Sequence, residues 1–193
     1  MWRWVMLVGA APALLTLLIT LFVPESERWK EAVKKGPARP GREIFSAGLW
    51  RTTLLAICFS SVALIVTWGI VQWIPLWADQ MTHGQQPKVK AYIQLASSIG
   101  AVVGCLIAPI LGGKFGRRPV YFGLCLASLF ACSFLFRTFQ QYSGAFLFTV
   151  GVVGMCTASF YGWLPQYLPE LFPTRVRATG QGLAYNFGRI LAA

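Results

Sequence analysis

The sequence predicts an all-α protein that crosses a membrane several times. Of its 193 residues, 56% are hydrophobic and 12% are charged, and the mean hydropathy is +0.58. An average soluble domain carries about 25% charged residues. Several apolar runs also reach the length of about 20 residues that a helix needs to cross a bilayer. These observations exclude an ordinary soluble domain and favour a polytopic helical bundle.

Five apolar runs are long enough for complete transmembrane helices, and none contains a charged side chain. They cover residues 5–23, 52–78, 92–111, 120–136 and 145–168. A sixth run begins near Thr179 and is still apolar at Ala193, the last residue. About 15 residues are too few to span the hydrocarbon core comfortably. We therefore predict about five full transmembrane helices and one partial helix.

The basic residues are distributed unevenly among the segments between the runs. Twelve follow the first, third and fifth runs: Arg28, Lys30, Lys34, Lys35, Arg39, Arg42, Arg51, Lys114, Arg117, Arg118, Arg175 and Arg177. Four lie on the other side: Arg3, Lys88, Lys90 and Arg137. Cytoplasmic loops are enriched in Lys and Arg, so we expect the first group in the cytoplasm. The net charge of +11 thus reflects topology, and no nucleic-acid partner is expected.

This orientation places Met1 outside the cell, an unusual start for a natural protein. A signal peptide would carry its charge before a shorter apolar core and end at a small-residue cleavage site. Here Val23 is followed directly by PESERWKE, with most of the charge after the run. We therefore expect no cleavage and expect that the chain begins inside a longer protein.

Residues for catalysis, metal binding or redox chemistry are not grouped in the sequence. All five cysteines fall within apolar runs and form no CxxC pair: Cys58, Cys105, Cys125, Cys132 and Cys156. The one histidine is His83, and the six acidic residues lie outside the centres of the runs. No Ser/His/Asp or HExxH arrangement is present. We therefore predict no metal, no cofactor and no enzymatic activity.

The third run carries small residues every fourth position: Ala96, Gly100, Gly104 and Ala108. Such a stripe allows the backbone of a neighbouring membrane helix to approach closely. It predicts a packed bundle rather than separate anchors.

Polar residues inside the runs favour a wet cavity, and the alternative is an aromatic belt at the membrane interface. Trp68, Gln72 and Pro75 share one helical face at spacings of four and three. Arg189 lies about ten residues into the sixth run, which places it roughly 15 Å along the helix axis. A guanidinium there costs about 2.5–3.5 kcal/mol unless it faces water or a partner. Asn186 precedes it by three residues on the same face.

Three segments resemble motifs of the major facilitator superfamily, near its sugar-porter and organic-acid:proton symporter branches. VPESERW at residues 23–29 is similar to the segment after helix six in those transporters. GGKFGRRPVY at residues 112–121 is similar to the basic motif between helices eight and nine. PELFPTRVRATGQGLAYNFGR at residues 169–189 is similar to the boundary of helices ten and eleven.

The resemblance implies a domain order. Residues 1–23 correspond to helix six, residues 24–51 to the cytoplasmic basic linker, and residues 52–193 to a C-terminal bundle of helices seven to eleven, the last truncated. The N-terminal half would then be missing. In that fold two six-helix halves surround a central site and rock about it.

The resemblance also implies site residues. Expected contributors to the substrate cavity are Gln72, Tyr185, Asn186 and Arg189. An intracellular gate would involve Lys114, Arg117, Arg118, Glu170, Arg175 and Arg177; the alternative is that these charges reflect topology alone. This chain departs from the pattern of strict sugar porters at three places. It keeps only Gln72 of a QQxxG-like sequence, has Pro165 where those porters have a tryptophan, and has Gly113 where they have an aspartate. Arg189 beside Asn186 suits a carboxylate, which a guanidinium binds through two hydrogen bonds.

We therefore predict a secondary active transporter, in fragment form, for a small polar metabolite such as a sugar or an organic acid. Proton coupling is expected, although no carboxylate lies within a run. The alternative is a truncated, non-transporting interaction or sensor protein derived from a transporter. Expected partners are the lipid bilayer, a small-molecule substrate with or without a proton, and the missing N-terminal half. The expected location is the cell (inner) membrane.

The predicted orientation can be tested with single cysteines in a background without the native ones. Cysteines at Gly36 and Gly113 should be shielded from an impermeant thiol reagent in whole cells, whereas one at Gly84 should be labelled. The reverse pattern would overturn both the orientation and the helix assignment.

Overall fold

The structure, a computed structural model, describes residues 2–24, 26–34 and 39–192. These residues belong to two units, residues 1–39 and residues 40–193. The first unit contains α1 (Trp2–Phe22) and α2 (Glu27–Lys34). Helix α1 is apolar over its length, whereas α2 is short and charged.

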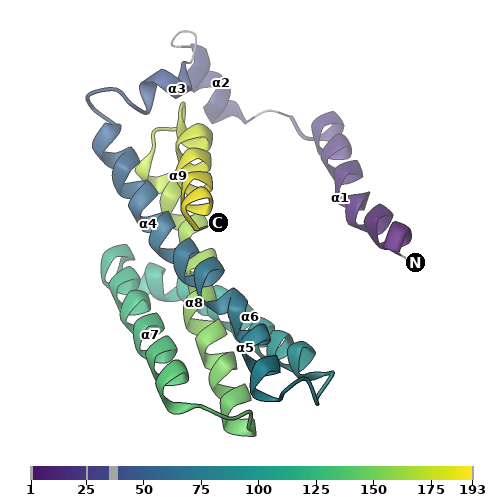
Figure 1. The fold of residues 1–193 in the computed structure, drawn as a ribbon. Coiled ribbons are helices and arrows are strands. Elements are labelled where there is room, and N and C mark those ends of the chain that lie inside the picture. Colours follow the sequence, from purple (N-terminus) through teal and green to yellow (C-terminus); the bar gives the residue numbers. More distant parts are fainter. Residues whose placement is uncertain (1, 25, 35–38, 193) are drawn as a thin grey trace. The chain divides into compact units, whose positions relative to one another are not determined.

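The second unit is a helical bundle (Figure 1). Its elements are α3 (Pro40–Glu43), α4 (Trp50–Gly69), the 3-10 turn η1 (Val71–Trp73), α5 (Ile74–Met81), α6 (Val89–Phe115), α7 (Arg117–Thr138), α8 (Gly144–Leu171) and α9 (Arg177–Ala192). Within the described residues no strand occurs, and four spans are long and apolar enough to cross a membrane. They are residues 50–81, α6, α7 and α8. The prediction of an all-α polytopic membrane protein is confirmed.

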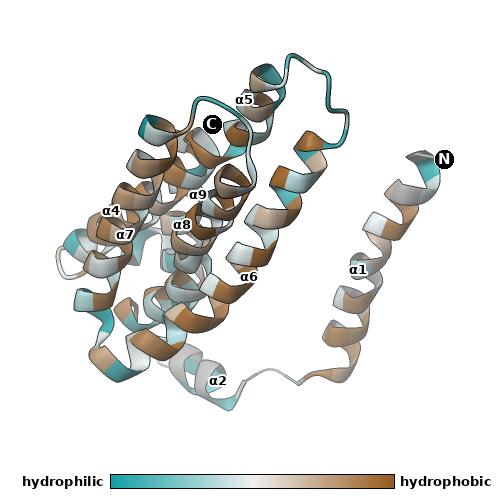
Figure 2. Ribbon diagram, turned by 90° about the horizontal axis from the view of Figure 1, so that it is seen from below, coloured by the Kyte–Doolittle hydropathy of each residue, from teal (hydrophilic) through white to brown (hydrophobic). Residues whose placement is uncertain are grey.

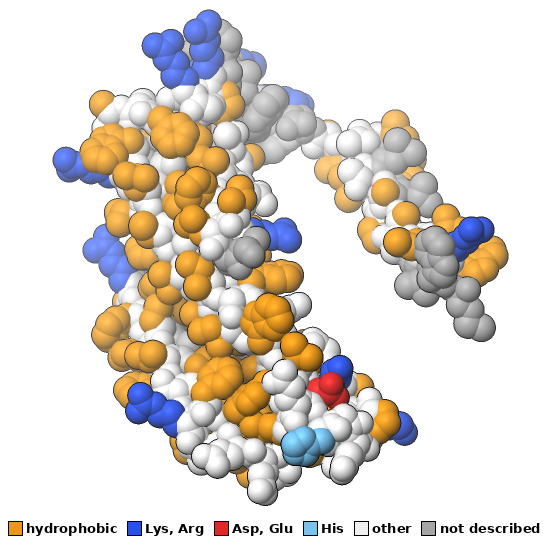
Figure 3. Space-filling model, in the orientation of Figure 1, with side chains coloured by type: hydrophobic (Ala, Val, Ile, Leu, Met, Phe, Trp, Pro, Cys, Tyr) orange, Lys and Arg blue, Asp and Glu red, His pale blue; other side chains and the backbone are white. Residues whose placement is uncertain are grey.

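Large apolar side chains remain on the outside of these spans. Leu106 and Ile110 on α6 are 65% and 68% exposed, and Phe122 and Phe130 on α7 are 66% and 69% exposed. Figure 2 shows hydrophobic residues along the helices and hydrophilic ones concentrated near helix ends and loops, and Figure 3 shows hydrophobic side chains spread over the visible face. A lipid-facing surface has this composition, because hydrocarbon needs no polar cover.

The second predicted run is interrupted rather than continuous. Helix α4 ends at Gly69, η1 covers the next turn, and α5 continues with Pro75 at its second position. Proline has no amide hydrogen and is tolerated in the first turn of a helix. The break therefore falls one turn before Pro75, and Gln72 lies within it.

Helices α6 and α8 pack with their backbones in direct contact. Glycines occupy the crossing on both helices: Gly100, Gly104, Gly154 and Gly162. A Cβ atom added at Gly100 would overlap the carbonyl oxygen of Gly151, and one at Gly104 would overlap that of Met155. Cβ atoms on the two α8 glycines would likewise meet backbone carbonyls of α6. The predicted packing role of the small-residue stripe is confirmed at this interface.

Two buried clusters lie at opposite ends of the bundle. One contains Ile44, Phe160, Trp163 and Phe172. It adjoins the end where α6 joins α7 and α8 joins α9, which we call the arginine end because Arg117 and Arg175 lie there. The other cluster contains Ile74, Ile93, Phe146 and Val150 and holds α5 against α6 and α8 at the opposite end.

A bulky side chain at the α6–α8 crossing should destabilise the bundle. Gly104→Leu forces a side chain against the α8 backbone, which cannot move as a flexible side chain would. We expect a loss of about 1–3 kcal/mol, as for other overpacked sites. Gly123→Leu on α7 is the matched control, because nothing lies within 4 Å of its Cβ position. Thermal unfolding of the two full-length variants in detergent measures the loss. Equal melting temperatures for Gly104→Leu and Gly123→Leu would contradict the close packing.

Candidate functional site

A cavity of about 250 Å³ lies beside the break between α4 and α5. Residues of α4, η1, α5, α6 and α8 line it, and many of them are polar. The polar lining residues are Thr67, Gln72, Gln94, Ser97, Ser98, Thr157 and Tyr161. We call this space the Gln72 cavity. It joins one predicted site residue, Gln72, to polar residues of two other helices.

Several of these side chains are free to bind a solute. Thr67 and Thr157 donate their hydroxyl hydrogens to carbonyls of their own helices, at 3.0 and 2.8 Å. Their oxygen atoms can still accept hydrogen bonds. Within the described residues, the Gln72 amide and the Tyr161 hydroxyl make no hydrogen bond. Polar groups inside a membrane domain are costly when unsatisfied, so water or solute is expected to satisfy them.

A second cavity, of about 280 Å³, contains two other predicted residues. Its lining consists of Pro165, Leu168, Gln181, Gly182, Tyr185 and Asn186, from α8 and α9. The amide nitrogen of Asn186 donates to the carbonyl oxygen of Gly182 at 2.8 Å, which leaves its side-chain oxygen available. We call this space the Tyr185 cavity. The predicted site residues are therefore divided between two cavities rather than gathered in one.

Arg189, the fourth predicted residue, lies on α9 against an aromatic ring of α4. Its guanidinium carbon is 5.7 Å from the ring centroid of Trp68. Within the described part of the chain, Arg189 makes no ion pair. Tyr185 of the Tyr185 cavity lies one turn earlier on α9.

Sequence reasoning missed the polar residues of α6 and the buried Thr157 of α8. Gln94 donates to Ser98 at 3.4 Å along one face of α6, and Thr157 is 1% exposed. Their position inside apolar runs could have indicated a cavity, since polar residues there tend to face one. Their convergence depends on how α6 crosses α8, which no single run reveals.

The predicted gate residues lie at the arginine end. Arg117, at the start of α7, donates from Nε and Nη2 to the two carboxylate oxygens of Glu170 on α8, at 3.2 and 2.7 Å. Arg175 pairs with Glu43 of α3 at 2.9 Å. The first pair joins α7 to α8, and the second joins the segment before α4 to the segment before α9.

The other three predicted gate residues make different contacts. Arg177 donates from Nε to the carbonyl oxygen of Phe172 at 3.3 Å. Lys114 lies over the ring of Phe115, with its amine 5.5 Å from the centroid. Arg118 is exposed. Two of the six residues thus pair with each other, and a third pairs with Glu43, which sequence reasoning did not include.

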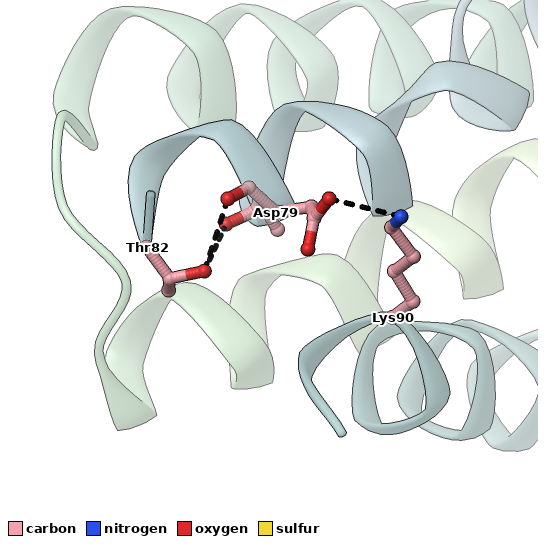
Figure 4. A network of polar contacts seen from close by, with 4 residues as sticks. Asp79, Thr82 and Lys90 are labelled. Carbon is pink, nitrogen blue, oxygen red and sulfur yellow. Dashed lines mark hydrogen bonds and ion pairs between the residues drawn. The ribbon is translucent and has the colours of Figure 1, made fainter. Parts of the chain in front are cut away.

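A charge pair at the opposite end ties α5 to α6. Lys90 Nζ lies 2.9 Å from Asp79 Oδ2, and Figure 4 shows the lysine extending from α6 to the carboxylate. Thr82 donates to the carbonyl oxygens of Ala78 and Asp79 and closes the end of α5. Because Ile74 and Pro75 of α5 line the Gln72 cavity, this pair holds one wall of the cavity in place.

Comparison with known proteins matches the chain to transporters. The family model of the Major Facilitator Superfamily matches residues 1–193. The chain is 24% identical to the cis,cis-muconate transport protein of Acinetobacter baylyi, covering 100% of this chain and 48% of the relative. It is 30% identical to the 3-(3-hydroxy-phenyl)propionate transporter of Escherichia coli, and the match covers 94% of this chain and 44% of the relative.

It is also 24% identical to the sialic acid transporter NanX of Escherichia coli, covering 97% of this chain and 45% of the relative. The chain therefore spans less than half the length of each of these three relatives. No solved structure matches it.

Reversing one charge of the Asp79–Lys90 pair should loosen α5. A cysteine at Thr157, in a background without the native cysteines, reports access to the cavity. Asp79→Lys should raise its labelling rate about two- to fivefold, because a partly exposed ion pair contributes up to about 1 kcal/mol. Asp79→Lys with Lys90→Asp should restore the original rate, and Gln80→Lys, which adds a charge nearby, should leave it unchanged. An unrestored rate in the charge swap would show that the pair does not hold α5.

Proposed function

Because the chain belongs to the Major Facilitator Superfamily, we propose that it forms the C-terminal half of a transporter that moves a small organic acid by alternating access. The observation that carries the proposal is the guanidinium of Arg189. It lies in α9, is exposed in this unit, and sits beside Trp68 without an acidic partner among the described residues. Thr67, the neighbour of Trp68 in the chain, lines the Gln72 cavity, and Asn186, three residues before Arg189, lines the Tyr185 cavity.

A carboxylate would complete the surroundings of Arg189. A cation over an aromatic ring gains about 0.5–2 kcal/mol, less than the cost of a guanidinium deep in a membrane. A carboxylate offers two charge-assisted hydrogen bonds to the planar fork of the guanidinium. The substrate would therefore bind Arg189 more strongly than Trp68 does, while Trp68 keeps the arginine in position when the site is empty.

The surroundings of Arg189 favour an acid with a flat, unsaturated or aromatic body over a sugar. The indole of Trp68 presents an apolar face beside the guanidinium, against which such a body can lie. Polar groups of the Gln72 cavity can then bind a second carboxylate or a hydroxyl group. The names of the three relatives denote carboxylic acids, which supports this substrate class.

We assign the arginine end to the cytoplasm, following the distribution of basic residues. The pairs Arg117–Glu170 and Arg175–Glu43 would then hold the cytoplasmic side of this half in one state and separate in the other. Lys114, Arg118 and Arg177 would add positive charge around them. The other wall of the pathway, and a carboxylate for proton coupling, would come from the N-terminal half of the full-length protein in the inner membrane.

A substrate panel tests the proposed class. Full-length protein in proteoliposomes should take up cis,cis-muconate, 3-phenylpropionate or sialic acid in a saturable manner, and glucose should not compete. An imposed proton gradient should accelerate the uptake. Saturable glucose uptake that these acids do not inhibit would contradict the proposal.

Substitutions of Arg189 should weaken transport of the acid. Arg189→Lys keeps the charge but loses the bidentate geometry. We expect a roughly tenfold lower kcat/KM for Arg189→Lys and a roughly 100-fold loss for Arg189→Gln, since hydrogen bonds to charged groups contribute about 1.5–3 kcal/mol. Arg137→Gln, at the end of α7, is the charge-matched control. With protein levels equal, unchanged kcat/KM in both Arg189 variants would exclude the binding role.

A further inference from the structure

The two cavities lie at different depths along α8, the one helix that lines both. Helix α8 contributes residues 150–161 to the Gln72 cavity, and Pro165 and Leu168 to the Tyr185 cavity. At 1.5 Å per residue, Thr157 and Leu168 are separated by about 16 Å along the helix. The Tyr185 cavity is therefore the nearer of the two to the arginine end.

The Tyr185 cavity offers both donors and acceptors. Within the described residues, the Gln181 amide and the Tyr185 hydroxyl make no hydrogen bond, and the Asn186 oxygen is left available. Pro165 has no amide hydrogen to donate to the carbonyl of Tyr161, which leaves a backbone acceptor between the two cavities. The volumes of the two cavities, about 280 and 250 Å³, are similar.

The two cavities approach each other along α8. Tyr161 lines the Gln72 cavity, and Pro165, four residues later, lines the Tyr185 cavity. Four residues of helix rise about 6 Å. A solute leaving the Gln72 cavity toward the arginine end would thus reach the Tyr185 cavity within about one turn of α8.

We propose that the Tyr185 cavity is a second binding station for the transported acid, occupied after the Gln72 cavity and before release at the arginine end. This inference rests on the proposed transport function. The donors of the Tyr185 cavity, Gln181 and Tyr185, receive the carboxylate as it leaves Arg189. Translocation through this half then has two steps, and the second can be blocked without loss of the first.

Gly182 allows the Tyr185 cavity to be filled selectively. It lines the Tyr185 cavity, and nothing lies within 4 Å of its Cβ position. A leucine there would occupy the cavity rather than displace protein atoms. Gly182→Ala and Gly182→Val provide smaller fillings, and Gly123→Leu on α7 again provides an open position outside both cavities.

The test compares binding and transport of radiolabelled cis,cis-muconate in full-length protein. Gly182→Leu should lower the maximal uptake rate at least tenfold and leave Kd within twofold. Gly182→Val and Gly182→Ala should give intermediate uptake rates, and Gly123→Leu should not change the rate. Gln181→Leu, which removes a donor, should lower the rate without changing Kd. An unchanged rate in Gly182→Leu, or loss of binding together with transport, would overturn the second station. Absence of binding and uptake in the unmodified protein would instead contradict the proposed function itself.

Discussion

Backbone contact between α6 and α8 is the constraint on which the rest of the second unit depends. Lipid chains are as apolar as leucine, so membrane helices associate through close packing rather than through the hydrophobic effect. Glycines at residues 100, 104, 154 and 162 allow this packing, since any Cβ atom there would meet the backbone of the opposite helix. The crossing brings Gln94 and Ser98 of α6 to the same space as Thr157 and Tyr161 of α8.

The polar features of the bundle are supported on this rigid pair. The interrupted α4–η1–α5 segment adds Gln72 to the cavity and is held to α6 by Asp79 and Lys90. At the arginine end, two ion pairs connect segments whose separation would open the bundle. Ion pairs that are partly exposed contribute little to stability. Breaking such contacts therefore costs little, as the proposed alternating-access mechanism requires.

Features that depend on local sequence were predicted well, and features that depend on helix crossings were not. The membrane spans follow from the length of apolar runs, and the packing stripe follows from its four-residue period. The division of Gln72 and Tyr185 between two cavities could not be foreseen, because it depends on the path of α8 between them. Glu43 was missed for a similar reason: it lies 132 residues from Arg175 in the chain, inside a charged segment without a distinctive motif.

The central claim is that Arg189 and the two cavities that α8 lines bind an organic acid. A cryo-EM structure of the full-length protein with bound cis,cis-muconate tests it most directly. The account predicts a carboxylate within about 3 Å of the Arg189 guanidinium, at charge-assisted hydrogen-bond distance, with the glycine crossing of α6 and α8 retained. A substrate bound away from both cavities, with Arg189 paired to an acidic side chain of the protein, would contradict it.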